Sequence, residues 1–229
     1  MKDITRDEAL VRVKRAIDSL STSADRAITD ILSLGVDIVD AQEGSLLLAN
    51  SENDLTFRKT VGVSRGKAKQ LYGQIIPAGE GIVGLALSTE QPQSSCPTYH
   101  STEQLGRRPD LVVAAPFFVY GHACGVITAV VFKSHTSASQ RVLSSFSRCA
   151  CLCGSLIESL VDGSNASSPS PLLDTGEMDE VIKGKGDFIA AVNHLRELFL
   201  TYPSAMPQCR SVLKSLLIMV RTVGKSNKG

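Results

Sequence analysis

The feature that most restricts the fold of this chain is the apolar stretch LVVAAPFFVYGHACGVITAVVFKS at residues 111–134. Tyr120-Gly121-His122 interrupts it near the middle with a turn signal, and β-branched residues are frequent on both sides. Two short apolar runs that flank a glycine turn predict two neighbouring antiparallel strands. The stretch therefore predicts a β-hairpin.

Earlier in the chain the hydrophobic spacing is first helical and then changes. Residues 7–20 and 24–40 each carry apolar side chains at helical spacing, and the polar STS at 21–23 can cap the second helix. The runs at 44–50 and 55–63 instead suit strands, and the polar SEND between them suits a turn. In the first helix the apolar stripe consists of Leu10, Val13, Ile17 and Leu20.

A glycine-rich segment, IIPAGEGIVGLALSTEQPQ, occupies residues 75–93. We expect Gly79-Glu80-Gly81 to form a tight turn into a short helix that begins near Ile82, with Gly84 allowing close approach to a strand. The spacing matches neither the phosphate-binding P-loop nor the dinucleotide-binding GxGxxG pattern. The next segment, 91–110, is polar, contains three prolines and predicts a long surface loop. Residues 136–161 again have helical spacing, with Thr136 or Ser137 as the expected N-cap.

Residues 1–161 thus predict an α+β domain, in which antiparallel hairpins lie between N- and C-terminal helices. Residues 162–177 are rich in Gly, Ser, Pro and Asp, which is typical of a flexible linker. Two more helical patterns, at 178–201 and 207–223, predict a C-terminal helical hairpin within a tail of residues 178–229.

Composition excludes several classes of function. The 229-residue chain has a formal net charge of +1, so no overall field attracts nucleic acid or an anionic membrane. No segment reaches the roughly 20 apolar residues that cross a bilayer, and residues 1–18 lack the apolar centre of a signal peptide. We therefore expect a cytoplasmic protein whose 6 cysteines are free thiols, most of them buried.

This order of elements, with these motifs, resembles the GAF family of small-molecule sensor domains. The resemblance covers about residues 5–161. It rests on ILSLGVDIVDAQEGSLLLAN, the glycine-rich segment, DLVVAAPFFVYGHACGVITAVV and the closing amphipathic helix. It implies a central antiparallel sheet with a ligand pocket on one face, closed by the short helix and the 91–110 loop.

The resemblance places the candidate ligand-binding residues in two groups. Gly81, Ile82 and Val83 begin the short helix, where they either form a packing turn at the pocket wall or present backbone N–H groups to a ligand. The loop contributes side chains that stack, hydrogen-bond or clamp an anion, unless they only face water. These loop candidates are Cys96, Tyr99, His100, Arg107 and Arg108.

Other motifs are weaker. In CACLC (149–153) a helix would put Cys149 and Cys153 on one face and Cys151 elsewhere, which suits a core better than a tetrahedral zinc site. The sequence contains no recognised catalytic motif, so we expect neither a catalytic residue nor a metal site. Haem, bilin and cyclic-nucleotide signatures are absent or incomplete, and the cofactor stays unknown.

The sequence therefore favours a cytoplasmic sensor that binds a small polar or anionic ligand under 91–110. The resemblance also predicts a homodimer formed through the terminal helices, and residues 178–223 could contact a protein partner. Two alternatives stay open. One is a ligand-free scaffold for dimerisation. The other is a thiol redox switch, or an enzyme similar to a methionine sulfoxide reductase, that uses Cys96.

Overall fold

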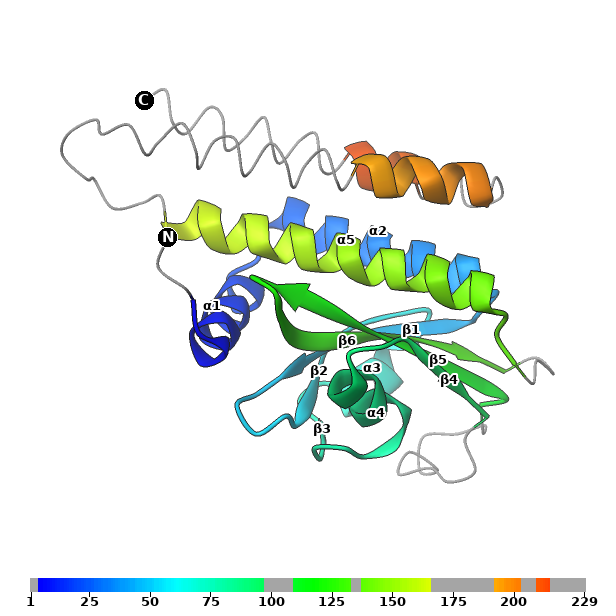
Figure 1. The fold of residues 1–229 in the computed structure, drawn as a ribbon, viewed down its shortest axis with the longest axis horizontal. Helices are drawn as coiled ribbons and strands as arrows, with labels where there is room; N and C mark the ends of the chain where they lie inside the picture. The colour runs from blue at the N-terminus through cyan, green and yellow to red at the C-terminus, as the bar shows by residue number, and fades with distance from the viewer. Residues whose placement is uncertain (1–3, 97–108, 133–136, 166–191, 203–208, 215–229) are drawn as a thin grey trace.

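The computed structural model describes residues 4–96, 109–132, 137–165, 192–202 and 209–214. Within these residues the strands form one six-stranded antiparallel sheet, in the order β3-β2-β1-β6-β5-β4 (Figure 1). The strands are β1 (Glu43–Ala49), β2 (Leu55–Val61), β3 (Ile75–Ile76), β4 (Gln93–Ser95), β5 (Leu111–Val119) and β6 (His122–Val131). The helices are α1 (Arg6–Asp18), α2 (Thr22–Val39), α3 (Arg65–Leu71), α4 (Gly81–Thr89) and α5 (Gln140–Asn165). The expected α+β fold is confirmed.

The central hairpin forms as the sequence predicts. Tyr120 and Gly121 connect β5 to β6, and both have positive φ angles, of 52° and 78°. Two consecutive residues in this conformation make a turn whose twist matches that of the flanking strands. Gly121 adopts it without strain, whereas Tyr120 has a Cβ that disfavours it. A non-glycine residue here indicates that contacts of the Tyr120 side chain hold the turn.

Short polar side chains begin the helices. The hydroxyl oxygens of Thr5, Ser21 and Ser64 accept hydrogen bonds from backbone N–H groups in the first turns of α1, α2 and α3. For α5 the expected cap at Thr136 or Ser137 is wrong, because the helix begins at Gln140. Ser139 takes that role, since its hydroxyl accepts from the Val142 N–H at 3.3 Å.

Helices cover the two faces of the sheet unequally (Figure 1). We call the face under α1, α2 and α5 the three-helix face, and the face under α3 and α4 the α4 face. On β1, Leu46 and Leu48 join the large core of the three-helix face, whereas Leu47 joins the smaller cluster under α4. This alternation is what a strand covered on both faces requires.

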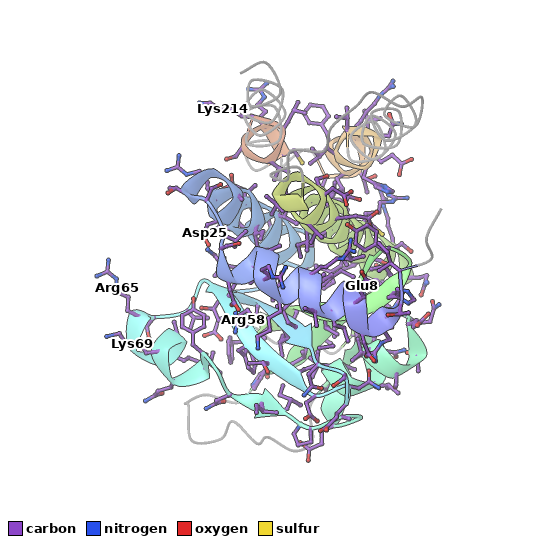
Figure 2. The ribbon with its side chains drawn as sticks, turned by 90° about the vertical axis from the view of Figure 1, so that its left-hand side faces the viewer. Glu8, Asp25, Arg58, Arg65, Lys69 and Lys214 are labelled. Atoms are coloured by element: carbon purple, nitrogen blue, oxygen red, sulfur yellow. The ribbon has the colours of Figure 1, made fainter. Side chains whose placement is uncertain are left out.

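The C-terminal segments add a further layer. Residues 192–201 and 209–214 are helical, and they lie outside α2 and α5, as Figures 1 and 2 both show. Their buried side chains continue the core of the three-helix face. The remaining parts of the expected tail helices, 178–191, 207–208 and 215–223, lie outside the described residues.

Several details differ from the sequence-based expectations. Helix α3 and strand β3 were not expected, and β4 lies within the segment predicted to be loop. Helix α5 continues to Asn165, so residues 162–165 are helical. At Gly84 the closest approach is to the turn before α4, because a Cβ there would lie 2.5 Å from the carbonyl carbon of Gly79.

Candidate functional site

A row of facing residues, polar except for Ala114, crosses the sheet. The register places Gln93 opposite Ala114, Ala114 opposite Thr128, Thr128 opposite Ser45, and Ser45 opposite Thr60. Directly opposed residues in antiparallel strands share a face, so all of these side chains lie on one side of the sheet. We call them the polar row. Its centre is deeply placed, since Ser45 is 5% and Thr128 6% exposed.

The polar row lies on the α4 face. Ser45 and Thr128 are each two residues from members of the apolar α4 cluster, Leu47 and Val126, and residues two apart on a strand point the same way. One step further along the sheet, the same face carries Ser95, Val112, Val130 and Glu43 in register. The α4 face therefore changes from apolar under the helix to a mixture of polar and apolar residues beyond it.

An ion pair borders the polar row. Lys67 of α3 places its Nζ 2.8 Å from each carboxylate oxygen of Glu43, and both side chains are mostly buried. The same Nζ lies 5.3 Å from the centre of the Phe132 ring, within reach of a cation–π interaction. A few polar groups beside an apolar wall are typical of small-molecule sites.

Helix α4 forms the apolar wall. Gly79 and Gly81 have φ angles of 74° and 60°, which only glycine adopts readily, and the helix begins at Gly81. Val83 is buried and Ile82 packs partly against the same cluster, so both serve packing. A Cβ at Gly81 would meet no atom within 4 Å, so the helix start borders open space. Val83 therefore has a packing role, whereas contact between a ligand and Gly81 stays a prediction.

Of the loop candidates, only Cys96 is described. It follows β4 directly and is exposed. Tyr99, His100, Arg107 and Arg108 lie outside the described residues, so their predicted roles stay predictions. The strands beside the loop are placed: Ser95, at the end of β4, lies opposite Val112 at the start of β5. The described strand residues on either side of 97–108 thus lie at one edge of the α4 face.

A separate cleft of about 430 Å³ lies between the α1–α2 connection, β2 and the end of α3. A bulge in β2, between the pairs Leu46–Lys59 and Leu47–Phe57, lets Arg58 and Lys59 both line it. Arg58 pairs with Asp18 and Lys59 with Asp25, so the charges of the cleft are matched internally. Figure 2 shows Arg58 and Asp25 on this side of the molecule. Within 91–110, none of the described residues, 91–96 and 109–110, lines the cleft.

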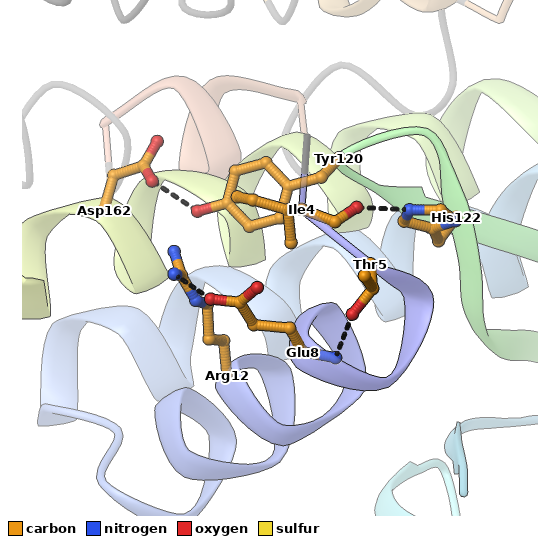
Figure 3. Close-up of polar contacts among 7 residues, drawn as sticks. All are labelled: Ile4, Thr5, Glu8, Arg12, Tyr120, His122 and Asp162. Carbon is orange, nitrogen blue, oxygen red and sulfur yellow. Dashed lines mark hydrogen bonds and ion pairs between the residues drawn. The ribbon is translucent and has the colours of Figure 1, made fainter. Parts of the chain in front are cut away.

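Polar contacts fasten the tip of the β5–β6 hairpin to the helices (Figure 3). The hydroxyl of Tyr120 donates to the carboxylate of Asp162 in α5, and its backbone N–H donates to Glu158 at 2.8 Å. His122 Nε2 lies 2.9 Å from the carbonyl oxygen of Ile4, just before α1. Burial, and then the hydrogen bond to Asp162, raise the pKa of Tyr120. The hairpin is thereby tied to both terminal helices.

The thiols divide as expected. Cys124, Cys149 and Cys153 are buried, and Cys151 is exposed. Burial raises the pKa of Cys124 to about 11 and that of Cys153 to about 12, so these thiols are poor nucleophiles at neutral pH. Among the described residues, no group of three or more His, Cys, Asp or Glu side chains could hold a metal ion.

Sequence reasoning missed the polar row. Each central hydroxyl is a single polar residue within an apolar strand, in GSLLLA and GVITAVV. That signal was readable, but which residues lie opposite one another depends on the strand register. Lys67 was missed because α3 was not expected.

Comparison with known proteins supports the fold. No family model matches the sequence, and no curated protein matches it significantly. Among solved structures, the GAF-B domain of DevS from Mycobacterium smegmatis is similar, with a TM-score of 0.52, 12% identity, and coverage of 63% of this chain and 99% of that domain. The GAF domain/HD domain protein from Geobacter sulfurreducens gives a TM-score of 0.50 and 13% identity, covering 64% of this chain and 97% of the other. The chain therefore has the fold of a GAF domain.

No described helix is both long and apolar enough to span a bilayer.

Proposed function

We propose that this protein is a cytoplasmic sensory or regulatory protein that binds a small polar ligand on the α4 face of its sheet. The observation that carries the proposal is the facing pair of buried hydroxyls, Ser45 and Thr128. Both residues are largely buried, so their hydroxyls lie deep on the α4 face, where they can donate to or accept from a small molecule. A ligand over the polar row would be their hydrogen-bond partner.

The surroundings define the chemistry of the ligand. Hydroxyl groups donate and accept, so the row suits carbonyl, hydroxyl and oxo-anion groups. Lys67 is neutralised by Glu43, which leaves little net charge beside the row. The ligand is therefore a small molecule that is held by directed hydrogen bonds and by apolar contact with α4. In this proposal the 97–108 segment covers the ligand and supplies Tyr99, His100, Arg107 or Arg108.

Signalling would use the elements shared between the site and the helices. Thr128 lies on β6, and the tip that joins β6 to β5 is held to α5 through Tyr120. A ligand changes the positions of the helices only if it binds one arrangement more tightly than another. The β5–β6 hairpin is a short structural link through which binding at Thr128 would affect the position of α5.

The test begins with a thermal-shift screen of nitrate, nucleotides and oxo-acids. Ser45→Ala and Thr128→Val should each weaken binding of the stabilising compound about 5- to 150-fold, because one hydrogen bond to a buried ligand contributes about 1–3 kcal/mol. Thr56→Val is the matched control, since Thr56 lies on β2 opposite Leu48, on the other face. Its affinity should stay within twofold.

Two results would count against the proposal. If no compound stabilises the protein, the scaffold alternative is favoured. If Ser45→Ala and Thr128→Val bind the compound normally, the site lies elsewhere, and the 430 Å³ cleft is the next place to examine.

The thiol alternative keeps one supporting observation, because Cys96 is exposed beside Ser95 at the edge of the same face. Cys96→Ser tests this alternative: a redox response that depends on the thiol would be lost, and an unchanged redox response would eliminate it.

A further inference from the structure

Helix α5 is buried on two opposite sides. Toward the sheet, Gly154 lies so close to β5 that a Cβ would be 2.2 Å from the carbonyl oxygen of Phe118. Toward the outside, Cys149 and Leu152 are 0% and 1% exposed. A helix with apolar side chains on two opposite sides needs cover on both of them. In this structure the C-terminal helices provide the outer cover.

The contacts of this cover are specific. We call residues 192–201 and 209–214 the cap. Leu195, Leu198, Cys209 and Val212 of the cap are at most 4% exposed and belong to the core of the three-helix face.

Two polar contacts fix the cap in position. Glu197 pairs with Arg148 of α5 at 3.1 Å, and the Ser211 hydroxyl donates to Asp30 of α2 at 2.7 Å. The cap therefore sits on both helices at once, as the layers in Figures 1 and 2 show.

The surface beneath the cap carries charges of both signs beside its apolar residues. It combines an apolar strip with one acid on α2, Asp30, and one base on α5, Arg148, both now held by cap side chains. In a twofold contact each patch meets the same patch of the other copy, so residue i meets j and j meets i. Asp30 of one copy could then face Arg148 of the other, twice per dimer.

We propose that the cap is an autoinhibitory element, and that the α2–α5 surface beneath it binds the same surface of a second copy when the cap is displaced. The cap belongs to the same chain, so its effective concentration exceeds that of a free partner, and the capped monomer dominates at low protein concentration. This inference needs no ligand and stands independently of the proposed small-molecule site.

The experiment displaces the cap by one substitution in the full chain. Leu198→Asp puts a charge at a position that is 0% exposed, while the control Leu200→Asp makes the same change on the same helix at a position that is 69% exposed. Light scattering after size-exclusion chromatography should show a monomer for the wild type and for Leu200→Asp. For Leu198→Asp it should show a dimer, with the dimerisation constant tightened at least tenfold.

Thiol accessibility shows whether the cap has left. Cys209 is 4% exposed in the capped protein and should react rapidly with a disulfide reagent in Leu198→Asp alone. A dimeric wild type whose Cys209 stays protected would overturn the proposal. So would a Leu198→Asp chain that is folded, has a reactive Cys209 and remains monomeric.

A gentler pair of variants covers the case in which Leu198→Asp fails to fold. Glu197→Arg places like charges together at the Arg148 contact, and Arg148→Glu combined with Glu197→Arg restores the pair in reverse. We expect Cys209 to react faster in the single variant and to return to the wild-type rate in the double variant. Equal rates in all three proteins would mean that this contact does not hold the cap, which contradicts the proposal.

Discussion

The two faces of the sheet differ in their helical cover and in the side chains that they bury. The three-helix face is covered by long helices and packs large side chains such as Phe117, Phe146 and Ile127 with almost no exposure. The α4 face has a smaller apolar cluster under short helices, and its buried hydroxyls lie beyond that cluster. Stability is therefore concentrated on one face, and the other has polar groups that a core does not need.

The sharpest way to test this difference is a matched pair of glycine substitutions, one on each face. Gly154→Ala should cost more than about 3 kcal/mol, because its Cβ would meet the Phe118 backbone, which has no flexible end to move. Gly66→Ala in α3 meets no atom within 4 Å and should change stability slightly, by up to about 0.5 kcal/mol in the favourable direction. Urea unfolding measures both. Similar losses in the two variants would show that the faces contribute alike.

Alkaline pH should weaken the three-helix face through its buried thiols. The pKa values of Cys124 and Cys153 are raised from 9.0 to about 11 and about 12, so the folded state holds their protons more tightly than the unfolded chain. Their contribution to the free energy of unfolding is fully present below pH 9 and is lost as the pH rises through the folded-state pKa values. Between pH 8 and 11, the free energy of unfolding of the wild type should therefore fall by about 2 kcal/mol more than that of Cys124→Ala.

Denaturant titrations at several pH values provide the measurement. If Cys124→Ala also follows the wild-type curve, the Cys124 thiol is not the group that loses stability.

The smallest expected effect concerns the hairpin tip that joins the sheet to the helices. Tyr120→Phe removes the hydroxyl that donates to Asp162 and should cost about 1 kcal/mol. Asp162→Asn weakens the same contact, so the double variant should lose little more than either single variant. Additive losses in this double-mutant cycle would show that the two side chains act independently.

Much of the fold was predictable because its signals are local. The turn at Tyr120-Gly121, the change from helical to strand spacing near residue 44 and the glycines before α4 each specify structure within a few residues. Helix α3 was harder to predict, since RGKAKQL is short, mostly polar and has little apolar periodicity. The N-cap of α5 was ambiguous because Thr136, Ser137 and Ser139 are all suitable capping residues, and only the hydrogen bond to Val142 selects Ser139.

The candidate site was less predictable, because it depends on pairing across strands. Ser45 and Thr128 are 83 positions apart by their residue numbers and meet only through the register of β1 and β6. The cover of α5 shows the same limit: the sequence predicts amphipathic helices in the tail, but not which surface they contact. The apolar stripe of α1 is another example. The sequence predicts the stripe, but only the structure shows that Leu10 and Val13 are buried within this chain.

The edges of the sheet have a consequence for how copies of the protein can meet. The outermost strands, β3 and β4, contain 2 and 3 residues. Such short borders offer few free N–H and C=O groups to an incoming strand, which is one way proteins avoid fibre-like aggregation. Copies of this molecule therefore gain little from pairing with either of these two outermost strands.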